Sequence, residues 1–176
     1  APLAVGIVAG TLVAGLAGLG LGYLTLRLRG VFFAIASLAL AVVLYIFIVN
    51  WDYVGGARGA YVLQPKDIPF GLPRYIHLLY AVQLVMAAFA LVVARVIEKS
   101  TMGRGLAAIR DDELAAECSG VPTLKLKILS TMVSCALMGM AGTTFPYYLS
   151  YIEPSSAFSL SYAVNSIAMP LIGGMM

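Results

Sequence analysis

Four long stretches of the chain contain no Asp, Glu, Lys or Arg, and each is long enough to cross a lipid bilayer as a helix. A bilayer core about 30 Å thick requires about 20 apolar residues, because a helix rises about 1.5 Å per residue. Composition agrees, since 61% of the residues are hydrophobic and 11% are charged, whereas soluble domains average about half and about a quarter. We therefore expect an integral membrane protein. The uncharged stretches are residues 3–26, 31–50, 75–94 and 128–152, followed by residues 155–176.

The predicted fold class is all-α, a polytopic transmembrane helical protein with about five apolar segments in a single domain over residues 1–176. An external loop is expected over residues 51–74 and a cytoplasmic loop over residues 95–127. The chain begins on Ala1 and ends within an apolar stretch, so we expect a fragment of a longer protein. The expected spans are about residues 3–26, 31–50, 75–94, 128–149 and 156–172.

The distribution of basic residues predicts the orientation of these loops. Residues 27–29 and 95–127 together hold eight Lys and Arg, whereas residues 51–74 hold three. Cytoplasmic loops of membrane proteins are enriched in Lys and Arg, and Trp and Tyr favour the membrane interfaces. We therefore place residues 95–127 inside and residues 51–74 outside. The aromatic residues expected near the outer interface are Trp51, Tyr53, Tyr61, Tyr75, Tyr147, Tyr148 and Tyr151.

Small residues recur at every fourth position of the first apolar stretch. In a bilayer such a ridge lets a second helix approach closely, where apolar burial gives little incentive to pair. We therefore expect this stretch to pack tightly against another span. The ridge consists of Gly6, Gly10, Ala14, Gly18 and Gly22, and a shorter ridge in the fourth stretch consists of Cys135, Gly139 and Thr143.

The apolar stretches lack the groups that would point to chemistry in the membrane. Carriers driven by protons or sodium ions usually place ionisable groups near the midplane, and here His77 and Gln83 are the only candidates. The sequence shows no metal-ligand cluster, no nucleophile–base pair and no phosphate-binding glycine loop, and Cys118 and Cys135 are expected to be reduced. We expect no catalytic residue, metal site, cofactor or nucleic-acid partner for this chain, and a membrane-embedded enzyme is disfavoured.

Residues 110–120, "RDDELAAECSG", concentrate five charged side chains in an otherwise apolar chain. Apolar positions around them recur at helical spacing, and Pro122 follows Gly120 closely enough to end a helix there. We expect a short amphipathic helix in the cytoplasm. It is either a solvated connection between spans or a docking surface with small residues on one face. The apolar positions are Ala108, Ile109, Leu114, Ala115 and Cys118.

The same passage resembles the cytoplasmic loop of bacterial ABC importer permeases, whose signature is Glu-Ala-Ala, three residues and Gly. Ala115, Ala116 and Gly120 match it, whereas Leu114 stands at the glutamate position, with Glu113 one residue early. Permeases for branched-chain amino acids share that departure. Three further stretches look like that branch, in the same order: "LRLRGVFFAIASLAL", "VGGARGAYV" and "YIEPSSAFSLSYAVNSIAMPLIGG".

The resemblance implies a permease subunit of the bacterial inner membrane that carries branched-chain amino acids. It also implies a second permease subunit, homologous or identical, two cytoplasmic ATPase subunits that bind ATP and Mg²⁺, and an extracytoplasmic substrate-binding protein. The alternatives are a related permease for urea, short amides or a monosaccharide, and a non-transporting membrane scaffold. The expected ATPase-coupling residues are Arg110, Glu113, Ala115, Ala116 and Gly120.

Two segments on the predicted outer side are candidates for the substrate path or for plain turns. The glycines suit positive backbone dihedrals in a compact turn. Pro154 suits a helix start, and Ser155 or Ser156 can cap the helix that follows. The positive end of that helix would then receive a substrate carboxylate. The candidate residues are Gly55, Gly56, Gly59, Pro154, Ser156 and Ser159.

Overall fold

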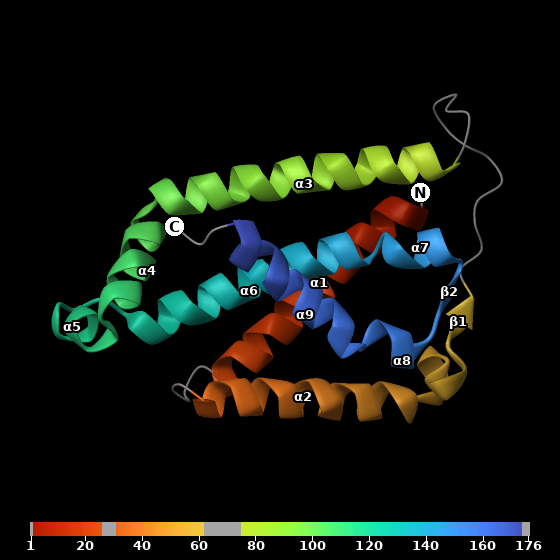
Figure 1. Cartoon of the computed structure of the whole chain (residues 1–176), viewed down its shortest axis with the longest axis horizontal. Coiled ribbons are helices and arrows are strands. Elements are labelled where there is room, and N and C mark those ends of the chain that lie inside the picture. Colours follow the sequence, from red (N-terminus) through yellow and green to blue (C-terminus); the bar gives the residue numbers. More distant parts are fainter. Residues whose placement is uncertain (1, 26–30, 62–74, 174–176) are drawn as a thin grey trace.

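The computed structural model describes residues 2–25, 31–61 and 75–173, and most of them are helical (Figure 1). The all-α polytopic fold class is confirmed. The longer helices are α1 (Pro2–Thr25), α2 (Val31–Val49), α3 (Tyr75–Lys99), α4 (Thr101–Asp111), α6 (Thr123–Gly142) and α9 (Leu160–Gly173). The short elements are η1 (Asp52–Val54), η2 (Gly56–Arg58), β1 (Ala60–Tyr61), α5 (Glu113–Cys118), α7 (Phe145–Leu149), β2 (Tyr151–Ile152) and α8 (Pro154–Ala157).

Within the described residues, three helical segments are long and apolar enough to cross a membrane: Leu3–Leu24, Tyr75–Lys99 and Thr123–Leu149. The third combines α6 and α7, and its helix starts at Thr123, five residues before the expected boundary. A shorter apolar helix, Ile35–Val49, lies in α2. The expected boundaries near residues 26–30 and residues 62–74 of the external loop lie outside the described residues.

The expected last span, residues 156–172, is interrupted in the structure. Its first residues belong to α8, and α9 begins only at Leu160. The Phe158 ring packs against the Tyr45 ring of α2 at 5.9 Å, and the Ser159 hydroxyl accepts a hydrogen bond from the Ser161 amide at 3.4 Å. Both contacts lie at the break between α8 and α9.

Helices α1 and α6 form the main helix–helix contact of the molecule, and they cross in its centre (Figure 1). A Cβ atom added at Gly10 or Gly139 would overlap the facing helix, and one at Gly18 would lie 2.6 Å from the Cys135 Cβ. The two helices therefore approach at distances that only small residues allow. The facing pairs are Gly6 with Tyr147 in α7, Gly10 with Thr143, Ala14 with Gly139, and Gly18 with Cys135; Gly22 is also buried.

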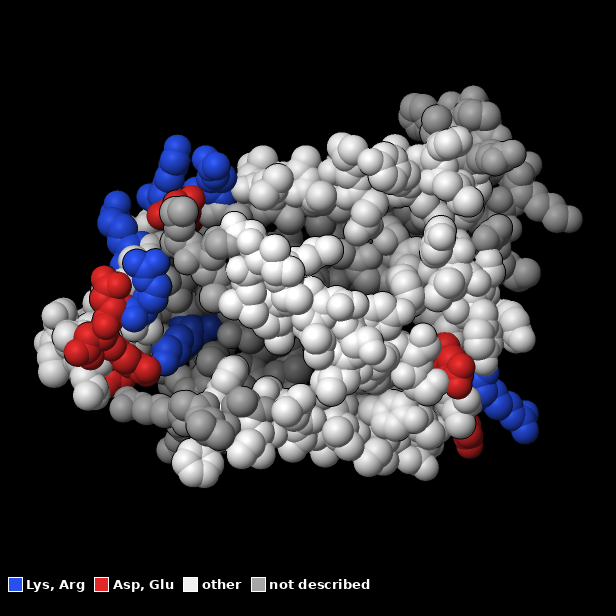
Figure 2. Space-filling view, in the orientation of Figure 1, with Lys and Arg blue, Asp and Glu red and all other residues white. Residues whose placement is uncertain are grey.

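Charged side chains gather at one end of the molecule, over α4, α5 and the end of α3, and few lie at the opposite end (Figure 2). The middle of the face shown is uncharged, as a helical protein in hydrocarbon requires. The aromatic residues expected near the outer interface belong to or adjoin η1, β1, α7, β2 and the start of α3, and these elements lie at the end away from α5 (Figure 1). The assignment of that end to the outside stays a prediction.

At that end, β1 and β2 pair in antiparallel fashion and join two distant segments of the chain. Ala60 pairs with Ile152, and the Tyr151 hydroxyl donates a 2.9 Å hydrogen bond to the Arg58 carbonyl. The three glycines of the turn have positive φ, with values of 104° at Gly55, 50° at Gly56 and 70° at Gly59. The turn is therefore built on conformations that favour glycine.

Replacing Gly59 with Val is expected to destabilise this junction by about 2 kcal/mol or more, because its φ of 70° and ψ of −173° lie in a region nearly restricted to glycine. An added Cβ would also overlap the Ile152 carbonyl oxygen. Thermal unfolding of the purified protein in detergent measures the effect. Ala57→Val is the matched control, because Ala57 is exposed in the same turn. Equal unfolding midpoints for the two variants would contradict the prediction.

Candidate functional site

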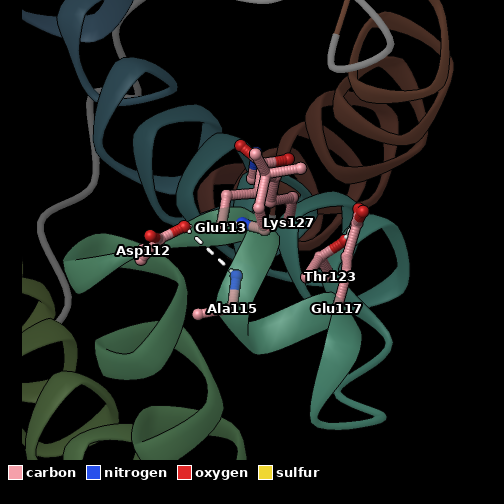
Figure 3. Close-up of polar contacts among 7 residues, drawn as sticks. Asp112, Glu113, Ala115, Glu117, Thr123 and Lys127 are labelled. Atoms are coloured by element: carbon pink, nitrogen blue, oxygen red, sulfur yellow. Dashed lines mark hydrogen bonds and ion pairs between the residues drawn. The ribbon is translucent and has the colours of Figure 1, made fainter.

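The charged passage forms a corner of two short helices, α4 and α5, that meet at Asp112 (Figure 3). Asp112 is extended, with φ −155° and ψ 115°, and its carboxylate accepts hydrogen bonds from the Leu114 amide at 2.8 Å and the Ala115 amide at 3.1 Å. This is the geometry of a helix N-cap. The prediction of one amphipathic helix through this passage is therefore wrong, because Asp112 caps a second helix instead of continuing the first.

The end of α5 is closed by backbone hydrogen bonds around Gly120. The Val121 amide bonds to the Ala116 carbonyl and the Gly120 amide to the Glu117 carbonyl, both at 3.0 Å. With Gly120 at φ 82°, this is a Schellman C-cap. Both ends of α5 are thus capped, which stabilises a helix of only six residues.

Two polar contacts tie α5 to the first turns of α6 (Figure 3). Lys127 Nζ lies 2.7 Å from Glu113 Oε2, and the two side chains are 23% and 30% exposed. The Thr123 hydroxyl donates a 2.8 Å hydrogen bond to Glu117 Oε1, and Thr123 is only 5% exposed. The corner is therefore attached to the cytoplasmic end expected for the α6 span.

The two alanines of the resemblance face in different directions. Ala116 is buried, with 4% of its surface exposed, whereas Ala115 is exposed beside Leu114, which is 59% exposed. Ala116, one of the expected ATPase-coupling residues, therefore packs within this chain, and its coupling role stays a prediction. Arg110 is also exposed, and it forms a 3.5 Å solvent-facing pair with Asp111.

Replacing Asp112 with Ala is expected to destabilise the corner by about 0.5–2 kcal/mol, the usual cost of losing an N-cap. Limited proteolysis of the purified protein should then cut near residues 110–115 at lower protease concentration. Asp112→Ser should retain most of the resistance, because Ser also caps helices. Asp111→Ala is the control, since it removes the same charge from a side chain that is 73% exposed. Equal cleavage of the Asp111 and Asp112 variants would contradict the capping role.

The outer candidate residues lie at the opposite end from this corner (Figure 1). Pro154 is the first residue of α8, but Ser155 and Ser156 lie inside that helix, and its N-cap is Glu153, whose side chain makes no capping hydrogen bond. The expected serine cap is therefore wrong at both positions. The Ser159 hydroxyl instead accepts a hydrogen bond from the Ser161 amide, in the first turn of α9. A cavity of about 190 Å³ lies beside this segment, lined by Phe145, Leu149, Tyr151, Ile152, Glu153, Ser156 and Ala157.

Sequence reasoning did not single out several residues that hold the site and the spans together. Asp112 carried a usable signal, because an acid directly before a run of helix formers is a typical N-cap. Thr144 did not, since only the fold brings its hydroxyl within 2.8 Å of Gln83 Oε1 on α3. Both cysteines are free thiols, with Cys118 exposed and Cys135 against α1.

The uncharged helices and the charged, capped corner define a polytopic helical membrane protein. The family model described as "Branched-chain amino acid transport system / permease component" matches residues 1–176, so the chain belongs to this family.

Two curated relatives are each named "High-affinity branched-chain amino acid transport system permease protein LivM", one from Salmonella typhimurium and one from Escherichia coli. Each is 28% identical to this chain over 188 aligned residues, which cover 93% of the chain and 44% of the relative. The chain thus spans less than half the length of these relatives. No solved structure matches it significantly.

Proposed function

We propose that this chain is the membrane-spanning permease subunit of an ABC importer that carries branched-chain amino acids across the bacterial inner membrane. ATP hydrolysis by separate cytoplasmic subunits would drive the transport. Family membership supports the permease role, and the names of the two relatives support the substrate class. In this proposal the helices of this chain form part of the path of the amino acid across the membrane. The partner subunits supply the energy for transport by hydrolysing ATP.

The α4–α5 corner is the observation that carries this proposal. It lies among the charges at one end of the molecule, its second helix is capped at both ends, and it is tied to α6. Its outer surface presents Leu114 and Ala115, an apolar and a small side chain beside solvated charges. A rigid projection of this kind can enter a groove on a cytoplasmic subunit and pass a displacement to the spans, which a loosely hydrated loop cannot do.

The remaining partners follow from the same proposal. A second permease subunit, homologous or identical, would complete the pore, and two ATPase subunits would bind ATP and Mg²⁺ at the cytoplasmic face. A substrate-binding protein would deliver the amino acid to the end that carries η1, β1 and α8. The large apolar side chains of α2 and α9 are mostly exposed in the isolated chain, so they are available to lipid and to the second permease subunit.

The proposal is tested by uptake into proteoliposomes that contain the complete permease, its ATPase subunits and its binding protein. We expect accumulation of labelled leucine that requires hydrolysable ATP and is suppressed by excess unlabelled isoleucine or valine. Suppression by urea or a monosaccharide instead would reassign the substrate. A membrane scaffold would show neither uptake nor an associated ATPase.

A further inference from the structure

We infer that the Glu113–Lys127 ion pair and the Thr123–Glu117 hydrogen bond act as a latch that fixes α5 to α6, so that a displacement of the corner moves α6 and α1 as one body. This inference rests on the proposed function, because it concerns how ATP hydrolysis would reach the membrane. It assigns Glu113, Lys127 and Thr123 as positioning residues for transport.

The ion pair has the geometry of a structural contact. Its 2.7 Å separation is short, and both side chains are mostly buried, at 23% and 30% exposure. The neighbouring Arg110–Asp111 pair is longer, at 3.5 Å, and both of its side chains are about three-quarters exposed, at 75% and 73%. Solvent and salt screen an exposed pair strongly and a partly buried pair much less. The Glu113–Lys127 pair is therefore the one that can hold the corner in place.

The second contact joins a buried Thr123 to an exposed Glu117, and it lies one helical turn before Lys127 on α6. The Thr123 hydroxyl donates to the Glu117 carboxylate, and a hydrogen bond to a charged acceptor is stronger than one between neutral groups. Glu113 and Glu117 are four residues apart on α5, as are Thr123 and Lys127 on α6, so one face of each helix supplies both contacts. Two contacts prevent α5 from rotating relative to α6, whereas a single contact would allow that rotation.

Helix α4 also contacts the same part of α6. A Cβ atom added at Gly105 would lie 2.6 Å from the Leu126 Cδ1. Close approach at Gly105 lets the first helix of the corner rest against α6 as well. Both helices of the corner therefore contact the start of α6 directly. The corner is thus coupled to α6 by packing as well as by the connecting residues 119–122.

The displacement continues from α6 to α1 because the two helices meet nearly backbone to backbone. The Gly10 carbonyl oxygen would lie 2.8 Å from a Cβ at Gly139, and Gly18 packs directly under Cys135. An interface of small residues has no long side chains that can change rotamer and absorb a shift, and packed interfaces rearrange in discrete steps. Movement of α6 therefore carries α1 with it.

The test uses the assembled transporter, with ATPase association, ATP hydrolysis and leucine uptake measured on the same preparations. Lys127→Met should retain the ATPase and hydrolyse ATP within about twofold of the wild type, but uptake per ATP should fall about fivefold or more, because a charge-assisted contact is lost. Glu113→Gln should also lower uptake per ATP. The charge reversal, Glu113→Lys with Lys127→Glu, should restore the ratio to within about twofold. Asp111→Asn is the matched control and should leave it unchanged.

Thr123→Val supplies a second variant, because it keeps the shape of a buried side chain and removes only the hydroxyl bond. Like the Glu113 and Lys127 variants, it should lower uptake per ATP. An unchanged ratio in Glu113→Gln and Thr123→Val, with wild-type association and uptake intact, would overturn the latch and leave the proposed function standing. Failure of the charge reversal to restore the ratio would also overturn it. Absence of an ATPase and of uptake in the wild type would instead refute the proposed function itself.

Discussion

Replacing Gly139 with Leu is expected to separate α1 from α6 and to prevent most of the protein from reaching its folded state. A Cβ atom at this position would overlap the Ala14 Cβ and lie 2.8 Å from the Gly10 carbonyl oxygen. Backbone atoms cannot move aside as the end of a flexible side chain can. Overfilling a packed core costs about 1–3 kcal/mol, and we expect a value at or above the upper end because Leu adds further carbons. Thermal unfolding in detergent and the yield of monodisperse protein measure the loss.

Gly142→Leu is the matched control for this substitution. Gly142 lies on the same helix as Gly139, but an added Cβ there would meet no atom within 4 Å. The control should fold as well as the wild type or slightly better, because Leu is a stronger helix former than Gly. A Gly139 variant that unfolds at the same temperature as the control would show that the α1–α6 contact does not hold the protein together.

Replacing Ala115 with Trp is expected to weaken association with the ATPase subunits and, with it, to reduce ATP-dependent uptake. Ala115 is exposed on the outer side of the corner, so the larger side chain would meet the partner and not this chain. If the interface is packed as densely as a protein core, overfilling it costs about 1–3 kcal/mol, which lowers affinity about five- to 150-fold at about 1.4 kcal/mol per tenfold. Copurification of the ATPase from detergent-solubilised membranes measures this change.

Two further variants separate docking from folding. Ala57→Trp places the same side chain on an exposed alanine at the opposite end of the molecule, and it should leave ATPase copurification unchanged. Ala116→Trp should also reduce association, but it should lower the unfolding temperature as well, because Ala116 is buried within this chain. Wild-type copurification and uptake in Ala115→Trp would argue for a solvated corner that touches no partner.

The membrane helices and their packing could be anticipated because their signals are local and repeated. A run without charges needs no tertiary information to indicate a span. Likewise, a small residue at every fourth position lies on one helix face whatever its neighbours are. Gly10, Ala14 and Gly18 accordingly lie against α6 in the structure. The pairing of Ala14 with Gly139 was not predictable, since spacing identifies a face and not the helix that covers it.

The corner was predicted less well, for a physical reason that Asp112 illustrates. Helical spacing of apolar residues suggested one helix, yet an acid with free carboxylate oxygens can cap a new helix as readily as it can sit within one. Once the chain turns at Asp112, the facing of every later residue changes. Ala116 then points inward and Ala115 outward, although both are equivalent in the signature. Which of the two alanines is buried depends on the angle between α4 and α5, and the spacing of apolar residues in the sequence carries no information on that angle.

The glycine contact between α1 and α6 also sets the order of events while the protein is being synthesised. Gly10 and Thr143 are about 130 residues apart, and ribosomes add about 5–20 residues per second. Helix α1 is therefore synthesised roughly 7–26 s before the part of α6 that packs against its glycines. During that time α6 does not cover the small-residue face of α1, so this face is accessible to small-residue helices of other membrane proteins.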